Sequence, residues 1–337
     1  MALVFADLPR GYGDVKAEVI ASRTRCALFD FSFLERARIE GPSAQPTLEA
    51  FASRSLATLA PGRIRYALRI APGGAVLADL TIWRSGPQAY DLMSGRREDL
   101  LDLLSLSGPA ARVTDLSTGT AILSLQGPRS LGALDGLGDL RAIAALPYFG
   151  FCHARLAGVP CTVGRLGYTG EPGFEIVLAP QDRASLWAEL AKRAQPAGFA
   201  AADILRIEAG FALFTNEFAI PVSPSEAGLG CFCDRPAVSF PKPVRLVCFR
   251  AASDHKLSLW RPPAGLARPD RPGMIVATSA CASVAADGVL GLGYVAAAEI
   301  SREAPLQDPA GWFRDIQLVS LPFYDAHKRR PRQPWWR

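Results

Sequence analysis

The feature that most constrains the fold is a change of pattern near Val244. Before it, segments with the apolar alternation of strands are mixed with segments of helical spacing. After it, short extended segments follow one another between turns, without an obvious helix. The chain has 337 residues with 30 Gly and 27 Pro, so it has many turns and is too long for one compact core. The pattern predicts an α+β part followed by a separate small β domain.

Charge and hydropathy exclude two classes of partner. The net charge is +5, and much of the excess lies in the segment His327–Arg337 rather than in a basic stripe. We therefore expect no nucleic-acid partner. No apolar stretch reaches the ~18 residues of a membrane span, and Met1–Gly13 does not resemble a signal peptide, so we expect no membrane association. The tail beyond Asp325 is predicted to be solvated or loosely docked.

The seven cysteines indicate a reducing compartment. Their number is odd and their spacing is unpaired, which is typical of free thiols in a cytoplasmic protein. Cys231 and Cys233 could form half of a metal site, but no second Cys or His pair accompanies them, and loop cysteines are the alternative. We predict no metal.

The segment Arg165–Ile176 carries the strongest chemical signal. Its glycines and proline predict a tight turn between two strands, and Glu175 falls on the second strand, on the face opposite Phe174 and Ile176. A carboxylate in such a semi-apolar place needs a hydrogen-bonding partner. A flat heterocycle with two parallel N–H donors, such as a pterin or guanine edge, satisfies it, and so does a structural arginine. The chemistry alone leaves both alternatives open.

Within that segment, Gly167–Glu175 resembles the Gly-Tyr-Thr-Gly-Glu-x-Gly-x-Glu signature of the aminomethyltransferase (glycine-cleavage T-protein) superfamily. Members of this family bind tetrahydrofolate, and the last Glu of the signature binds the pterin. The resemblance therefore implies tetrahydrofolate as the cofactor and Glu175 as a residue that binds it. Further matches follow in the same order over nearly the whole chain, namely Leu28–Ser32, Gly73–Leu80, Leu125–Pro128, Leu205–Gly210, Asn216–Glu217, Pro224–Gly230 and Thr278–Ser279.

The resemblance also implies a fold. Family members have three domains around a central opening, two of them α+β and the last a small β barrel. We expect residues 1–120 and 121–243 to form two interleaved α+β halves, residues 244–325 the C-terminal β barrel, and residues 326–337 a basic tail.

Asp79 is the candidate catalytic residue. It lies within a predicted strand, on a face shared with Leu77, Thr81 and Trp83, where Asp is uncommon. It could act as an acid or base beside the folate N5, or face water on an edge strand. The resemblance favours the first role, because it places the family's catalytic aspartate here; only the second Asp of the family's pair is kept, since Ala78 replaces the first.

Three further residues are predicted to bind the cofactor. The family counterpart of Arg206 lies near the folate, although by itself Arg206 fits a structural ion pair better. Tyr168 either covers the pterin face or packs beneath the turn. Ser94 occupies the position where the family usually has an Asn at the start of the next helix.

Departures from the family pattern concern the one-carbon donor. Phe33 stands where T-proteins typically have His, and Cys231 replaces a common Trp. We expect a divergent paralogue, an enzyme that transfers a methyl group from a small methylated molecule to tetrahydrofolate. One alternative is the aminomethyltransferase of the glycine cleavage system, with a lipoyl carrier protein as partner. The other is a non-enzymatic folate-binding protein that serves assembly or regulation.

Overall fold

The structure is a computed structural model that describes residues 7–236, 238, 240–298 and 305–334. The chain divides into two compact units built from segments that are distant in sequence. Unit 1 comprises Met1–Arg69, Asp79–Ala202 and Arg329–Arg337, and unit 2 comprises Ile70–Ala78 and Asp203–Lys328. Helix α6 (Phe199–Glu208) begins in unit 1 and ends in unit 2. The domain boundaries expected from the family resemblance stay a prediction.

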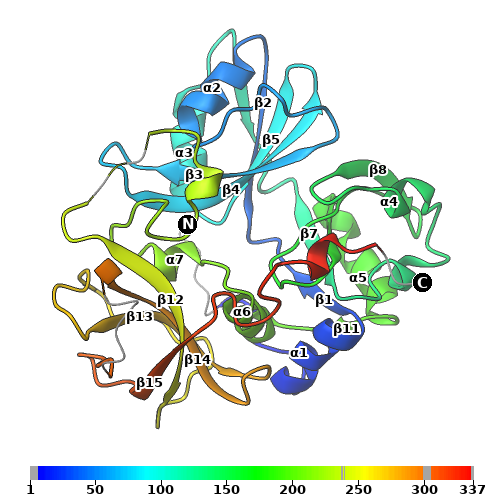
Figure 1. Cartoon of the computed structure of the whole chain (residues 1–337). Coiled ribbons are helices and arrows are strands. Elements are labelled where there is room, and N and C mark those ends of the chain that lie inside the picture. Colours follow the sequence, from blue (N-terminus) through cyan, green and yellow to red (C-terminus); the bar gives the residue numbers. More distant parts are fainter. Residues whose placement is uncertain (1–6, 237, 239, 299–304, 335–337) are drawn as a thin grey trace. The chain divides into compact units, whose positions relative to one another are not determined.

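Unit 1 contains a five-stranded sheet in the order β3-β4-β5-β2-β6 (Figure 1). Its strands are β2 (Glu35–Glu40), β3 (Ile64–Ile70), β4 (Val76–Gly86), β5 (Ala89–Ser94) and β6 (Arg112–Asp115). Helices α2 (Ala44–Phe51) and α3 (Arg97–Ser105) supply Leu48 and Leu100, which pack in one core with Ile39, Leu80 and Leu92 of the sheet. The expected hairpin around Pro72-Gly73-Gly74 is formed by β3 and β4.

Unit 1 also contains a six-stranded sheet in the order β11-β1-β7-β10-β9-β8, antiparallel except for the β1–β11 pair. Its strands are β1 (Ala27–Asp30), β7 (Ala121–Gln126), β8 (Phe151–Leu156), β9 (Val159–Gly164), β10 (Gly173–Leu178) and β11 (Gln195–Pro196). The accompanying helices are α1 (Val15–Thr24), η2 (Gly132–Leu134), α4 (Arg141–Ala144), η3 (Pro180–Asp182) and α5 (Arg183–Ala191). The hairpin expected around the signature segment is confirmed as β9 and β10.

One face of this second sheet is apolar. Phe174 and Ile176 of β10 form a core with Leu123 of β7 and with Leu186 and Leu190 of α5. Because side chains alternate along a strand, the residues between them point to the opposite face.

Trp83 of β4 connects the two sheets of unit 1. Its ring is 2% exposed, and its centroid lies 5.2 Å from that of Phe151 in β8. A Cβ atom at Gly164 of β9 would lie 2.2 Å from the Cη2 atom of Trp83, so only glycine leaves room for the indole. The side of β4 that does not face its own helices therefore packs against the end of β9.

In its described residues, unit 2 is mainly a β domain, which also contains the second half of α6 and two short helical elements between α6 and the first strand. These are α7 (Phe214–Glu217) and η4 (Gly230–Phe232), and the strands are β12 (Val244–Ala252), β13 (Ile275–Ser283), β14 (Gly288–Ala296) and β15 (Arg314–Val319). The strand order is β13-β14-β12-β15, so the extended segments expected after Val244 form one sheet.

The expected closed barrel is not present in the described part of the chain. β13 and β15 are the edges of an open sheet. Leu306 and Gln307 reach these edges only through isolated bridges to Ile316 and Met274, so they do not add a fifth strand. Closure of a barrel needs a continuous ladder around the ring, which two single bridges do not supply.

The segment 330–333 is docked on unit 1, which corrects the expectation of a loose tail. Pro331 of η6 (Arg330–Arg332) is buried, and the Nε atom of Arg330 lies 3.0 Å from Oε2 of Glu171. A guanidinium nitrogen of Arg165 donates to the carbonyl oxygen of Gln333. The sequence could not show this because the acceptor, a buried carboxylate, lies 159 residues away.

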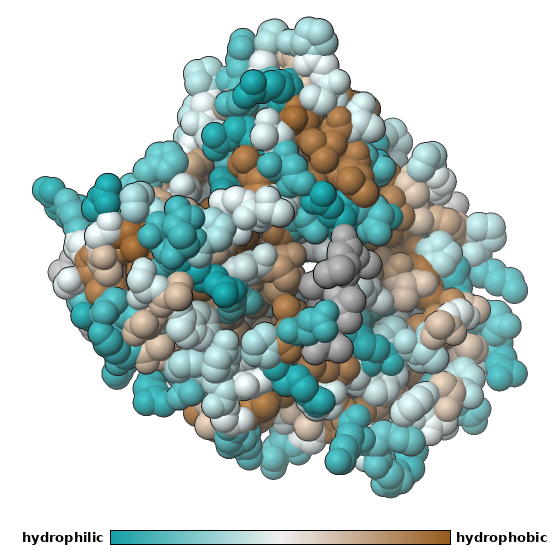
Figure 2. Space-filling view, turned by 180° about the vertical axis from the view of Figure 1, so that it is seen from behind, coloured by the Kyte–Doolittle hydropathy of each residue, from teal (hydrophilic) through white to brown (hydrophobic). Residues whose placement is uncertain are grey.

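None of the described helices is long and apolar enough to cross a membrane. On the face drawn in Figure 2, hydrophobic residues form separate areas among hydrophilic ones.

The turn at Gln126-Gly127-Pro128 leaves no space for a side chain. Gly127 has a φ angle of +141°, and a Cβ atom there would lie 2.5 Å from the carbonyl oxygen of Arg25 and 2.7 Å from that of Ser22. Gly158 also has a positive φ, +82°, but no atom lies within 4 Å of its Cβ position.

Gly127→Ala is expected to lower the free energy of unfolding more than Gly158→Ala. Both variants force a side chain into a positive-φ conformation, which costs roughly 1–2 kcal/mol. Gly127→Ala adds a clash with two backbone carbonyls, and overpacking typically costs about 1–3 kcal/mol. Urea denaturation of both variants measures the difference, and equal losses would contradict the steric argument.

Candidate active site

The site begins with one row of residues across the six-stranded sheet. The strand registers pair Phe29 with Ser124, Ser124 with Glu175, Glu175 with Gly164, and Gly164 with Phe151. Glu175 therefore lies between two of the smallest side chains, with an aromatic ring beyond each. Residues directly opposite on antiparallel strands have Cβ atoms about 5 Å apart, so the carboxylate has only small side chains beside it on this row, and the indole of Trp83 packs over Gly164.

Glu175 is a buried carboxylate without a hydrogen-bond donor among the described residues. It is 7% exposed, and burial alone raises the pKa of its carboxyl to about 7. Tyr148 lies close enough to interact with it, since burial and then the charge of Glu175 both raise the pKa of the Tyr148 phenol. Buried carboxylates are normally paired or hydrogen-bonded. This one is therefore suited to accept hydrogen bonds from a ligand.

Gln126 holds the signature loop that precedes Glu175. Its Nε2 atom donates to the carbonyl oxygen of Leu166 at 3.1 Å, and its Oε1 atom accepts from the hydroxyl of Thr169 at 3.0 Å. Cβ atoms at Gly167 and Gly173 would lie 2.0 and 2.6 Å from its side chain. The amide of Gln126 thus requires glycine at two of the three glycine positions of the signature.

The first Glu of the signature, Glu171, has a structural role in unit 1. Its Oε1 atom lies 3.1 Å from Arg23 of α1, and its Oε2 atom lies 3.0 Å from Arg330. The guanidinium of Arg23 also donates to the carbonyl oxygen of Thr169 at 2.8 Å. Two arginines therefore fix this loop from both ends of the chain.

Asp79 lies on the face of β4 that also carries Thr81 and Trp83, as the alternation predicts. Burial of Asp79 raises the pKa of its carboxyl to about 6, and the negative charge of Asp99 adds to this increase. Hydrogen bonds from the backbone N–H of Asp79 and from the hydroxyl of Tyr66 lower the pKa and so limit the increase. Trp83, on the same face, meets Gly164, the register neighbour of Glu175. The faces that bear Asp79 and Glu175 therefore meet within unit 1.

Ser94 and Tyr168 stay predicted cofactor-binding residues. The hydroxyl of Ser94 donates to Oδ2 of Asp99 at 2.8 Å and accepts from the backbone N–H of Arg96 at 3.0 Å, so it supports the start of α3. Tyr168 is half-buried in the signature loop.

Arg206 belongs to a buried polar network of unit 2. It is fully buried, and its nitrogens donate to Asp203 at 2.9 Å, to Glu217 at 2.8 Å and to the hydroxyl of Ser279 at 2.7 Å. Glu217 also accepts from Thr278 at 2.9 Å. Three motifs that are separate in sequence therefore meet around one guanidinium. This geometry gives Arg206 a supporting role, and its contact with the cofactor stays a prediction.

Within the part of the chain that the structure describes, no group of three or more His, Cys, Asp or Glu residues could hold a metal ion.

Two residues of the site were not predicted. Tyr66 was missed, although the hairpin around Pro72-Gly73-Gly74 places it on the strand next to Asp79, which was the available signal. Tyr148 was missed because nothing local links it to Glu175, which lies in a different strand.

A family model and the sequences of known proteins identify the same family for this chain. The model of the GCVT N-terminal domain matches residues 4–236. An aminomethyltransferase of Streptomyces coelicolor is 35% identical over 233 residues, which are 66% of this chain and 62% of that protein. An aminomethyltransferase of Geobacillus kaustophilus is 35% identical over 232 residues, which are 66% of this chain and 64% of that protein. The match thus spans less than two thirds of the length of these relatives.

The fold is similar to a solved structure. The glycine cleavage system aminomethyltransferase T from Bartonella henselae superimposes with a TM-score of 0.69 at 23% sequence identity, covering 93% of this chain and 90% of that one. This likeness establishes the α+β fold expected from the sequence.

Glu175→Gln is expected to stabilise the ligand-free protein at pH 8 and to change little at pH 4. With a pKa of about 7 in the folded protein against the ordinary 4.5, the carboxyl is neutral in both states at low pH. Its ionisation then reduces the stability of the parent as the pH rises from 4.5 to 7. The difference between these pKa values corresponds to roughly 3 kcal/mol. Denaturant unfolding at both pH values measures it.

Glu171→Gln on the same loop is the matched control and should have the opposite effect. It leaves Arg23 and Arg330 without their carboxylate. The loss should be below the about 3–5 kcal/mol typical of a broken buried pair, because the side chain of Arg330 is 36% exposed. If Glu175→Gln lost stability at pH 8 as Glu171→Gln does, a protein group would have to be paired with Glu175.

Proposed function

We propose that this chain, which belongs to the GCVT N-terminal domain family, is a tetrahydrofolate-dependent one-carbon transferase. The observation that carries the proposal is the carboxylate of Glu175, buried in unit 1 without a hydrogen-bond donor among the described residues. The relatives named aminomethyltransferase support the reaction class.

The residues around Glu175 fit the pterin of tetrahydrofolate. The pterin edge offers two parallel N–H donors, and a carboxylate accepts such a pair in a bidentate manner. Ser124 and Gly164 are the small neighbours of the carboxylate on its row, the indole of Trp83 packs over Gly164, and Phe29 and Phe151 come next on the row. Donation by the ligand favours the charged carboxylate, which compensates for the burial that raises its pKa. In this proposal Glu175 binds the pterin and Tyr168 covers one of its faces.

Asp79 is proposed as the catalytic acid or base. A pKa of about 6 lets its carboxyl gain or lose a proton near neutral pH, the range in which a general acid or base is effective. The hydroxyl of Tyr66 holds the carboxylate in one orientation. When bound, tetrahydrofolate supplies the nucleophilic nitrogen that accepts the one-carbon group. We also propose Ser94 and Arg206 as cofactor-binding residues. In the structure, Ser94 supports the start of α3, and Arg206 holds the polar network of unit 2.

For the donor, we propose a small methylated molecule. Phe33, at the position where T-proteins typically have His, belongs to an aromatic cluster in which its ring centroid lies 5.6 Å from that of Phe31 and 5.8 Å from that of Phe199. An apolar surrounding at this position favours a methyl-bearing donor over a polar aminomethyl group. The second candidate is aminomethyl transfer from a lipoyl carrier protein, which the names of the relatives favour.

Glu175→Ala is expected to weaken tetrahydrofolate binding by tenfold or more. Removal of a charged, hydrogen-bonded acceptor typically costs about 1.5–3 kcal/mol. Isothermal titration calorimetry measures the affinity, with Glu189→Ala on α5 as the control, because that glutamate is partly exposed and pairs with the exposed Lys192. An unchanged affinity of the Glu175 variant would refute the proposed pterin site.

Asp79→Asn is expected to keep tetrahydrofolate affinity within a few-fold and to lower turnover by about 10²–10⁴. The turnover of the parent should also show an inflection near pH 6 that the variant lacks.

The donor is tested in the same assay. Sarcosine, dimethylglycine and an aminomethyl-lipoyl carrier are supplied in turn, and the folate product is measured. Turnover only with the carrier would favour the second donor, and parental turnover in the variant would remove Asp79 from the mechanism. Folate binding without turnover on any donor would favour a binding protein.

A further inference from the structure

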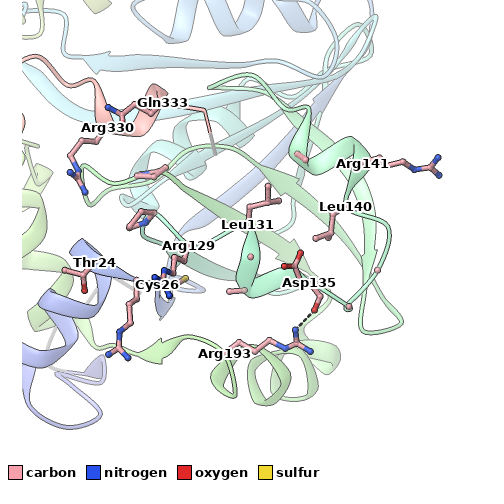
Figure 3. A pocket seen from close by; sticks show the side chains of 18 of the residues that line it. Thr24, Cys26, Arg129, Leu131, Asp135, Leu140, Arg141, Arg193, Arg330 and Gln333 are labelled. Atoms are coloured by element: carbon pink, nitrogen blue, oxygen red, sulfur yellow. Dashed lines mark hydrogen bonds between the residues drawn. The ribbon is translucent and has the colours of Figure 1, made fainter. Parts of the chain in front are cut away.

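A pocket of about 1380 Å³ lies in unit 1 beside the six-stranded sheet, apart from the row that contains Glu175. Its walls come from the end of α1, the Gln126-Gly127-Pro128 turn, the residues around η2 and α4, and the segment 330–333. Figure 3 shows Arg330 and Arg141 at opposite ends of this pocket, with Arg129 and Arg193 between them. The proposed one-carbon chemistry uses none of these side chains.

The charge of the pocket is strongly unbalanced. Its described lining contains two carboxylates, Asp135 and Asp139, and six arginines: Arg23, Arg25, Arg129, Arg141, Arg193 and Arg330. Four of the six already have acceptors. Arg23 and Arg330 pair with Glu171, Arg141 pairs with Asp139, and Arg193 donates to the carbonyl oxygen of Asp135.

Arg25 and Arg129 have no side-chain acceptor among the described residues. Both are exposed, and they lie side by side because the backbone N–H of Arg129 donates to the carbonyl oxygen of Arg25 at 2.8 Å. Two like charges carried on adjoining backbone segments repel each other, and an anion that binds to both reduces that repulsion. The wall that they form is therefore suited to carboxylates from outside the chain.

The rest of the lining distinguishes between classes of polyanion. Leu131, Leu140 and Ala144 give the pocket an apolar side. No aromatic residue is among the described residues that line it, so bases would have no ring on which to stack. The carboxylates of Asp135 and Asp139 would repel a continuous phosphate backbone. A segment that alternates acidic and apolar side chains matches both the arginines and the apolar side.

We propose that this pocket is the docking site for an acidic, partly apolar segment of a partner protein. The arginine pair binds its carboxylates, and the apolar wall receives its aliphatic side chains. Docking here is separate from the binding of folate at Glu175, so the two can be tested independently.

The probe is a fluorescein-labelled 16-residue peptide of Glu and Leu, compared with a peptide in which Lys replaces Glu and with a 16-nucleotide single-stranded DNA. Fluorescence anisotropy measures binding to the full chain. The double variant Arg25→Glu/Arg129→Glu is compared with Arg112→Glu/Arg245→Glu, which makes the same change in net charge at exposed arginines outside the pocket. Tetrahydrofolate affinity is measured for both, and it should not change.

The pocket variant should weaken binding of the acidic peptide by about tenfold or more, while the control variant stays within about twofold of the parent. Circular dichroism shows whether each variant is folded, and Arg25→Gln/Arg129→Gln replaces the pocket variant if it is not, with a several-fold loss expected. Equal losses in the two double variants, no binding of the peptide to the parent, or tighter binding of the DNA than of the peptide would each overturn the proposal.

Discussion

The geometry of the candidate site depends on the side chain of Gln126. Its amide occupies the space that Cβ atoms at Gly167 and Gly173 would take, and it bonds to Leu166 and Thr169 on the two sides of that space. The signature loop therefore closes around an amide rather than around an apolar core. Because β10 follows directly from this loop, the position of Glu175 depends on those bonds. A carboxylate without its own hydrogen bonds has to be held by its backbone, and Gln126 supplies that support.

The two units use buried charge in different ways. In unit 2, Arg206 and Glu217 satisfy each other and the hydroxyls around them, as expected of a network that fixes a structure. In unit 1, Glu171 is paired on both of its oxygens, whereas Glu175, four residues later, has no donor among the described residues. A buried polar group that the fold leaves unsatisfied is the one that a ligand can satisfy. This contrast distinguishes the binding carboxylate from the structural one within a single signature.

Local patterns were sufficient to place Asp79 and Glu175, because strand alternation is a property of neighbouring residues. The small β domain after Val244 was predictable for the same reason. The contacts that join distant segments were not: Tyr66 beside Asp79, Tyr148 near Glu175, and Arg330 on Glu171 all depend on tertiary packing. That the β domain does not close into a barrel was also beyond local reasoning, since it depends on how Leu306 and Gln307 meet the two edges, where they form only isolated bridges. The charge of the segment 330–333 was visible, but its acceptor was not.

The pairing of Glu171 with both Arg23 and Arg330 has a consequence for biosynthesis. Arg23 is made before Glu171, but Arg330 follows 159 residues later. At typical translation speeds of about 5–20 residues per second, that interval lasts roughly 8–30 s. During it, the ribosome produces nearly all of unit 2, while unit 1 still lacks its last segment. Co-translational folding of the first unit therefore cannot include the pair of Arg330 and Glu171 until the ribosome has made the second unit.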